Sequence, residues 1–186
     1  MNTTQKTTIF IVIAVFLALL FFKGYIKPSE LVYSGTIETT EIEYPVNVYF
    51  DEYGVPSVFA ETDEDMFFVA GYIGARDRLF QMSFMKYAYK GQLSKVLNDT
   101  LFVEDKFLRT LGFERIAEKS LNKMPPEIIK NLQKTCDGIN AYIKTLSPKE
   151  FPLEFRLIGI DELPTFEPKD IAGPVSYTHL TLPTKA

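Results

Sequence analysis

The sequence predicts an α+β chain with an N-terminal membrane helix, a β-hairpin and a mainly helical remainder. Residues 9–22 are apolar without interruption, which is typical of a helix that enters a membrane. Residues 46–50 alternate between apolar and polar side chains, which is the period of a half-buried strand. After residue 62, apolar residues recur three and four positions apart in two long segments, which indicates packed helices.

Composition limits the possible classes of protein. The chain has 186 residues, 46% of them hydrophobic and 14% aromatic, which favours a packed core over disorder. The net charge of -4 and the scattered Lys and Arg residues give no sign of nucleic-acid binding. The lone Cys136 cannot form an internal disulfide and is interpreted as a small core residue.

The N-terminal apolar segment, residues 9–22, is flanked by Lys6 and Lys23. As a helix it would be about 21 Å long, and the neighbouring residues bring it close to the roughly 30 Å of a hydrocarbon layer. No small-x-small cleavage site follows Phe22, so we expect an uncleaved membrane anchor, with a cleaved signal segment as the alternative. Either alternative predicts an exported chain that is extracytoplasmic, either periplasmic or at the cell surface.

A β-hairpin is predicted next. Val46, Val48 and Phe50 share one face of the first strand, residues 52–54 supply the turn, and residues 55–60 return. Residues 33–42 are a further candidate strand.

The central helix is predicted over residues 62–91. Thr62 is a candidate N-cap, acidic residues 63–65 suit the first turn, and Gly91 can end the helix. The segment is apolar nearly all round, so we expect it to be buried, with close approach of another backbone at Gly71, Gly74 and Ala75.

A charged triplet, Arg76-Asp77-Arg78, interrupts the apolar surface of this helix. A buried Asp77 needs a cation, which could be Arg76, Arg78 or a more distant residue. The triplet is either a charged site in a cleft or a structural ion pair, and the structural interpretation is favoured.

The remainder is helical. Residues 104–122 are compatible with a helix despite Gly112, and the prolines at 125 and 126 precede a second helix that continues to residue 146. Within it, residues 137–140 are either a polar site or a packing surface against the central helix, and packing is favoured. Residues 165–170 resemble a helix cap and start.

The last segment, residues 174–186, differs in character from what precedes it. It is not expected to continue the helix that starts at Asp170, and it resembles a translated adapter tail, so native sequence is predicted to end near residue 172 or 173. His179 lies within this tail and is rejected as a catalytic base.

The rest of the sequence carries no motif that is typical of a catalytic or metal-binding site. The sequence has no His/Cys metal cluster, no phosphate-binding glycine loop and no Gly-x-Ser-x-Gly motif. Acidic residues 63–65 and 104–105 could be cation ligands, but the helix dipole explains them more simply. No catalytic, cofactor-binding or metal-binding residue is therefore assigned.

An ordered series of motifs over roughly residues 40–170 resembles the start of penicillin acylase (penicillin amidase) precursors, which are N-terminal nucleophile hydrolases. The motifs are Asp51-Glu52-Tyr53-Gly54-Val55-Pro56, Ala60-Glu61-Thr62, Gly71-Tyr72 through Gln81-Met82, Gly91-Gln92-Leu93-Ser94, Asp105, Arg109, Leu111-Gly112, Gly138-Ile139-Asn140-Ala141 and Pro152-Leu153-Glu154-Phe155. The resemblance covers only the alpha-chain half of the family.

The resemblance implies an organisation of the whole protein. Residues 1–27 would be the anchor or signal segment, residues 28–173 a partial alpha-chain region of an αββα hydrolase, and residues 174–186 a non-native tail. Family precursors cut themselves, and the beta chain then starts with the nucleophile, whose own amino group is the base. The implied partners are this beta chain, a small-molecule amide such as a beta-lactam side-chain amide, and a membrane contacted through residues 9–22.

The resemblance also implies calcium in the full-length enzyme, with none bound by this fragment. The fragment should be inactive because its nucleophile is absent, and helix faces shaped for the beta chain should be exposed. Two alternatives remain open: an acyl-homoserine lactone acylase of the same superfamily, and a non-enzymatic membrane-anchored helical interaction protein.

Overall fold

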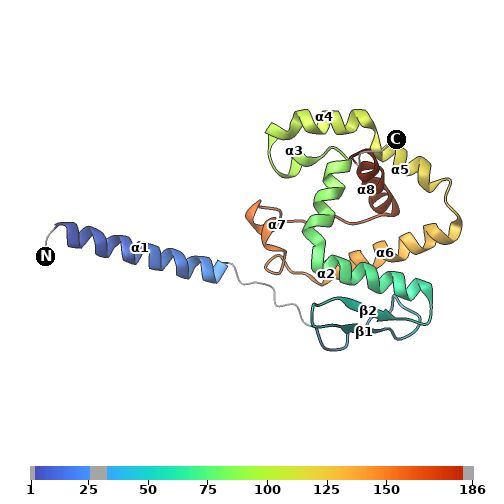
Figure 1. Cartoon of the computed structure of the whole chain (residues 1–186), viewed down its shortest axis with the longest axis horizontal. Coiled ribbons are helices and arrows are strands. Elements are labelled where there is room, and N and C mark those ends of the chain that lie inside the picture. Colours follow the sequence, from blue (N-terminus) through green and yellow to red (C-terminus); the bar gives the residue numbers. More distant parts are fainter. Residues whose placement is uncertain (1–2, 26–32, 182–186) are drawn as a thin grey trace. The chain divides into compact units, whose positions relative to one another are not determined.

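The computed structural model describes residues 3–25 and 33–181, with side chains in most of these positions. The chain divides into two units, residues 1–32 and residues 33–186. Each unit is described by itself below (Figure 1). The domain boundaries expected at residues 27 and 173 stay predictions.

The first unit contains one helix, α1 (Thr3–Tyr25). The predicted helix is present, but no helix in the described residues is long and apolar enough to cross a membrane. The membrane anchor predicted for residues 9–22 is therefore wrong, and the membrane-anchored, extracytoplasmic location based on it is contradicted. The uninterrupted apolar stretch covers only residues 9–22 of this helix, and Lys6 and Lys23 on either side of it are charged.

The second unit begins with the predicted hairpin. Strands β1 (Asn47–Phe50) and β2 (Pro56–Phe59) pair antiparallel, with Val48 opposite Val58. Asp51 fixes the turn because its Oδ1 accepts hydrogen bonds from the N–H groups of Tyr53 and Val55 at 2.9 and 2.8 Å. Residues 33–42 form no strand; they are irregular and almost entirely exposed.

The central helix is α2 (Asp63–Tyr89), and its predicted N-cap is confirmed because the Thr62 side chain accepts from the Asp65 N–H at 3.1 Å. The helix is kinked at Arg78, where φ is -140°. One face is buried, but Asp77, Arg78 and Gln81 are exposed, so the prediction of a helix buried nearly all round is wrong at the kink. Gly91, at φ 59°, follows the helix as expected.

α2 packs most extensively on α6 (Pro126–Thr145). At the crossing, a Cβ on Gly71 would lie 2.1 Å from the Thr135 carbonyl oxygen, and a Cβ on Gly138 would lie 1.9 Å from that of Phe68. Close backbone approach at Gly71 is thus confirmed. At Gly74 it is wrong, because a Cβ there would meet no atom within 4 Å.

Shorter helices complete the unit: α3 (Leu93–Val96), η1 (Asp99–Leu101), α4 (Phe102–Leu111), α5 (Phe113–Leu121), α7 (Leu153–Leu157) and α8 (Pro168–Thr181). The helix expected over residues 104–122 is two helices, because Gly112 adopts φ 73° between them. α8 runs on through Pro174 to Thr181, so the expectation that the helix stops before the tail is wrong.

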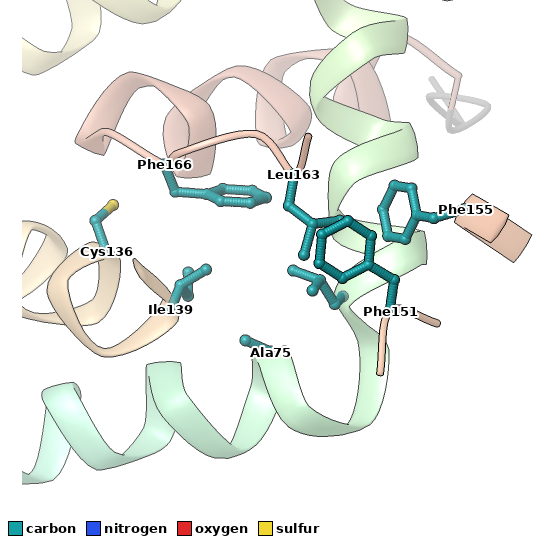
Figure 2. Close-up of a cluster of buried hydrophobic side chains, with 8 residues drawn as sticks. Ala75, Cys136, Ile139, Phe151, Phe155, Leu163 and Phe166 are labelled. Atoms are coloured by element: carbon teal, nitrogen blue, oxygen red, sulfur yellow. The ribbon is translucent and has the colours of Figure 1, made fainter. Parts of the chain in front are cut away.

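The core lies between α2, α6 and the segments around α7 and α8. Figure 2 shows aromatic and aliphatic side chains meeting there, with Cys136 and Ile139 entering from α6 and Ala75 from α2. Phe155 is buried and packs edge-on against Phe80, with ring centroids 5.2 Å apart. Cys136 is fully buried, which confirms its interpretation as a core residue, and burial raises the pKa of its thiol to about 12.

Candidate functional site

The charged triplet at the kink of α2 is the first candidate. Arg76 Nε donates to Asp77 Oδ1 at 2.8 Å, so the partner of Asp77 is its neighbour in sequence. The Arg76 guanidinium also lies over the rings of Phe50 and Tyr33, 4.7 and 5.2 Å from their centroids. Such contacts contribute about 0.5–2 kcal/mol each depending on desolvation, so Arg76 attaches the hairpin to α2.

The other two members of the triplet face outward. Asp77 and Arg78 are both exposed, and Arg78 Nη1 donates to Gln81 Oε1 at 3.1 Å. The triplet therefore favours a structural ion pair over a charged catalytic site, although Asp77 is less buried than the sequence suggested.

In the part of the chain that the structure describes, three other carboxylates are buried, and their roles are mainly structural. Asp65 accepts from the N–H groups of Glu43 and Tyr44 at 2.8 and 3.1 Å, which holds the segment before the hairpin against α2. Asp105 accepts from the N–H groups of Leu93 and Ser94, both at 2.8 Å, and caps α3 from the side of α4.

The third buried carboxylate, Asp170 at the start of α8, is the centre of a polar network. Lys86 Nζ donates to its Oδ2 at 2.7 Å, and Lys90 Nζ lies 2.8 Å from its Oδ1. The Tyr89 hydroxyl donates to the same Oδ1, and the Glu167 N–H donates to Oδ2 at 3.0 Å. The network attaches the end of α2 to α8.

Local charges and hydrogen bonds lower the pKa of all three buried carboxyl groups. Burial raises each pKa, but the donated hydrogen bonds and nearby cations outweigh it in Asp65, Asp105 and Asp170. For Asp170 the main opposing contributions come from Lys86 and Lys90. The charged form is therefore the one that the fold stabilises.

We expect this arrangement to make the chain sensitive to acid. A carboxyl group whose pKa is lower in the folded state contributes stability above its unfolded pKa, here near 3.8, and loses that stability as the pH falls through the folded value. Asp105→Asn should therefore lower the free energy of unfolding by about 1–3 kcal/mol at pH 7, because an amide NH₂ would face N–H donors. The difference from wild type should shrink below pH 4. Urea unfolding at several pH values measures it, and an Asp105→Asn effect that is constant with pH would contradict it.

Two cavities of the second unit are lined in part by Arg109. One cavity of about 400 Å³ is lined mainly by α4 and α5 and carries cations and carboxylates together, among them Lys90, Arg109, Arg115, Glu114 and Glu118. A second of about 310 Å³ includes Ser94, Asp105 and Thr110. Arg109 is fixed by donating from Nε to the Gly91 carbonyl oxygen at 2.8 Å.

Ser94 and Asp105 both line the second cavity and form a hydroxyl–carboxylate pair. Ser94 Oγ donates to Asp105 Oδ2 at 2.6 Å. A carboxylate with a lowered pKa and three donated hydrogen bonds is a poor base, so it does not activate the hydroxyl for attack. The side chain of His179 lies outside the described residues, and no role is assigned to it.

The described residues contain no group of three or more His, Cys, Asp or Glu side chains placed to hold a metal ion. Of the acidic clusters considered as cation ligands, Asp65 and Asp105 direct their oxygens to backbone N–H groups. Asp65 follows the N-cap and Asp105 lies in the first turn of α4, which favours the structural interpretation of both clusters.

The polar segment over residues 137–140 also has a structural role. Gly138 forms the close contact with α2, and Asn140 makes two hydrogen bonds to the backbone of Phe166, one in each direction, at 2.8 and 2.9 Å. The Asp170 network was not predicted, but Lys86 and Lys90 four positions apart in an apolar helix were a signal for a buried anion.

Comparison with solved structures shows the fold of this chain. A thermostable penicillin G acylase from Alcaligenes faecalis has a similar fold, with a TM-score of 0.66 and 24% identity over 72% of this chain and 71% of that chain. The predicted mainly helical α+β organisation is thus that of a penicillin acylase chain.

The sequence comparisons give the family. The family model for penicillin amidase matches residues 45–186, and the chain belongs to this family. The chain is 28% identical over 131 residues to the penicillin acylase 2 proenzyme of Pseudomonas sp. (strain SE83), covering 70% of this chain and 17% of the relative. It is 32% identical over 113 residues to penicillin G acylase of Escherichia coli, covering 57% and 13%.

A third relative is named for a different substrate class. An acyl-homoserine lactone acylase of Pseudomonas syringae pv. tomato is 29% identical over 110 residues, covering 59% of this chain and 13% of the relative. The chain therefore spans less than a fifth of the length of each of these curated relatives.

Proposed function

We propose that this chain supplies the helical alpha-chain part of an amide hydrolase that acts on linear, N-acylated small molecules. The observation that carries the proposal is the family match over residues 45–186. The described residues bring no activated nucleophile together with a base, and the Ser94–Asp105 pair is unsuited to that role. We therefore place the nucleophile outside residues 1–186.

The reaction that we propose follows the N-terminal nucleophile mechanism. A serine, cysteine or threonine at the start of a second chain attacks the amide carbonyl, and its own amino group takes the hydroxyl or thiol proton. The C–N bond then breaks and the amine leaves with that proton, which gives an acyl-enzyme. Water hydrolyses the acyl-enzyme to the free acid and restores the nucleophile. Backbone or side-chain donors on that chain stabilise the oxyanion. The present chain contributes the rigid support formed by α2, α6 and α8.

The relatives support a two-chain enzyme. One curated relative is a proenzyme, and this chain covers 17% of it. We infer that the family precursor is processed and that a separate beta chain is the partner of this chain.

Calcium belongs to the same proposal for the full-length enzyme. The buried Asp65 and Asp105 are poorly placed to bind calcium, because their carboxylate oxygens already accept backbone hydrogen bonds. We propose no calcium ligand among the described residues and no step that depends on the ion.

A second substrate class is kept because of the relatives. Acyl-homoserine lactone acylases match over 110 residues of this chain, close to the span of the penicillin acylases. A panel of penicillin-type amides and acyl-homoserine lactones, given to the complete gene product, separates the two. Failure of every substrate would favour a non-enzymatic interaction protein.

We expect purified residues 1–186 to release no chromophore from an acyl nitroanilide, because the chain lacks the reactive terminus. The complete gene product from the same locus should release it under identical conditions. The measurement is absorbance against a protein-free blank, with a boiled sample of each protein as the control. Turnover by residues 1–186 above the blank would show that the site is complete without a second chain.

A further inference from the structure

The cavity of about 400 Å³ lies where three helices meet. The end of α2, the last turn of α4 and the first turns of α5 line it, and Gly112 joins α4 to α5 at its wall with φ 73° (Figure 1). Small-molecule sites in proteins have volumes of roughly 300–1,000 Å³. The cavity is therefore large enough for a small ligand, and its charged side chains determine which kind of ligand suits it.

Two of the five charged side chains in this cavity already have partners within the chain. Lys90 Nζ lies 2.8 Å from Asp170 Oδ1, and Glu114 Oε1 lies 3.9 Å from Lys169 Nζ. The charges of Lys90 and Glu114 are therefore balanced without a ligand.

The other three charged side chains of the cavity are Arg109, Arg115 and Glu118. Arg109 donates from Nε to the Gly91 carbonyl oxygen at 2.8 Å, which fixes the side chain and leaves its terminal nitrogens available. In residues 33–181, which the structure describes around this cavity, Arg115 and Glu118 form no hydrogen bond or ion pair. Arg115 Nη2 lies only 3.2 Å from the point where a Cβ on Gly112 would be, so its guanidinium is next to the end of α4.

These three groups are complementary to a zwitterion. A guanidinium binds a carboxylate through parallel N–H donors, and a carboxylate accepts hydrogen bonds from an ammonium group. Arg115 and Glu118 are three positions apart on α5, so they lie on the same side of the helix. A simple anion would be repelled by Glu118, and a simple cation would be repelled by Arg109 and Arg115.

We propose that this cavity binds a small zwitterionic molecule of the amino-acid type. Arg109 and Arg115 bind its carboxylate, and Glu118 binds its ammonium group. The inference goes beyond the proposed function, because it rests on the charged side chains of this chain and holds whether or not the gene product hydrolyses amides.

The test titrates γ-aminobutyrate into residues 1–186 and into the complete gene product at pH 7, followed by isothermal titration calorimetry. This probe has no amide bond, so hydrolysis cannot interfere. Butyrate lacks the ammonium group and propylamine lacks the carboxylate, which makes them the control ligands. We expect saturable binding of γ-aminobutyrate and at least about tenfold weaker binding of each control ligand, because each loses one charge-assisted contact.

Two variants assign the binding to the cavity. Arg115→Gln and Glu118→Gln should each weaken γ-aminobutyrate binding at least about tenfold. The matched control is Lys119→Gln, an exposed position on α5 that does not line the cavity, and it should bind like wild type. Arg115 and Glu118 are exposed too, so both variants should keep the far-UV circular dichroism and melting temperature of wild type.

Four results would overturn the proposal. They are no saturable binding of γ-aminobutyrate, equally tight binding of butyrate, unchanged affinity in both cavity variants, and binding to residues 1–186 that is absent from the complete gene product. Equally tight binding of butyrate would show a simple anion site, and loss in the complete gene product would show that another part of it fills the cavity. Amide hydrolysis without binding of the probe would leave the proposed function intact.

Discussion

Gly138→Ala should destabilise the chain more than a change of one methyl group normally does. The new Cβ would lie 1.9 Å from the Phe68 carbonyl oxygen and 2.9 Å from the Tyr72 nitrogen. Both are backbone atoms of α2, so no side chain can rotate to make room, and α2 and α6 must separate. Overpacking of this kind costs about 1–3 kcal/mol, and Gly71→Ala, 2.1 Å from the Thr135 carbonyl oxygen, should behave in the same way.

Gly74→Ala is the matched control. A Cβ there meets no atom within 4 Å, and alanine is the better helix former by about 0.8–1.0 kcal/mol. This variant should be as stable as wild type or slightly more stable. Urea unfolding followed by circular dichroism measures all three variants. Equal effects at Gly138 and Gly74 would show that helix propensity, and not the close crossing of α2 and α6, determines the result.

Asp170→Asn should lower the free energy of unfolding by about 3–5 kcal/mol, because it leaves two largely buried cations without their anion. Lys86 and Lys90 both contact the Asp170 carboxylate, and the side chain of Asp170 is 0% exposed. The variant also weakens the contact between α2 and α8. The measurement is again urea unfolding at pH 7.

Lys169→Ala tests whether removal of any charge at the start of α8 lowers the free energy of unfolding as much as Asp170→Asn does. Lys169 lies next to Asp170, but its ion pairs with Glu114 and Glu167 are at the surface, at 3.9 and 3.3 Å. Surface pairs contribute about 0–1 kcal/mol, so the effect should be small. A loss at Asp170 no larger than that at Lys169 would mean that the buried network contributes little to stability.

Local signals in the sequence predicted much of the fold. The N-cap at Thr62, the hairpin turn at residues 52–54 and the close approach at Gly71 each depend on a few neighbouring residues, and each is confirmed. Gly112 was a local signal too, and its positive φ divides a helix that periodicity alone would have continued.

The errors concern features that depend on distant parts of the chain. Asp77 was expected to be buried, but the kink at Arg78 brings it to the surface, and no neighbouring residue predicts that kink. The buried anion is Asp170 instead, whose partners precede it by more than 80 residues. The apolar character of residues 9–22 was correct, but it suggested a membrane span that α1 does not provide.

The candidate site was predicted less well than the fold. The three buried carboxylates could be recognised as acidic residues near helix starts, but their structural role became clear only from their N–H and lysine partners.

The most direct test of the two-chain account is N-terminal sequencing of the complete gene product after purification. The account predicts two chains that copurify, the larger of which starts with serine, cysteine or threonine and loses activity when that residue is replaced by alanine. A single uncleaved polypeptide that hydrolyses the amide would contradict it.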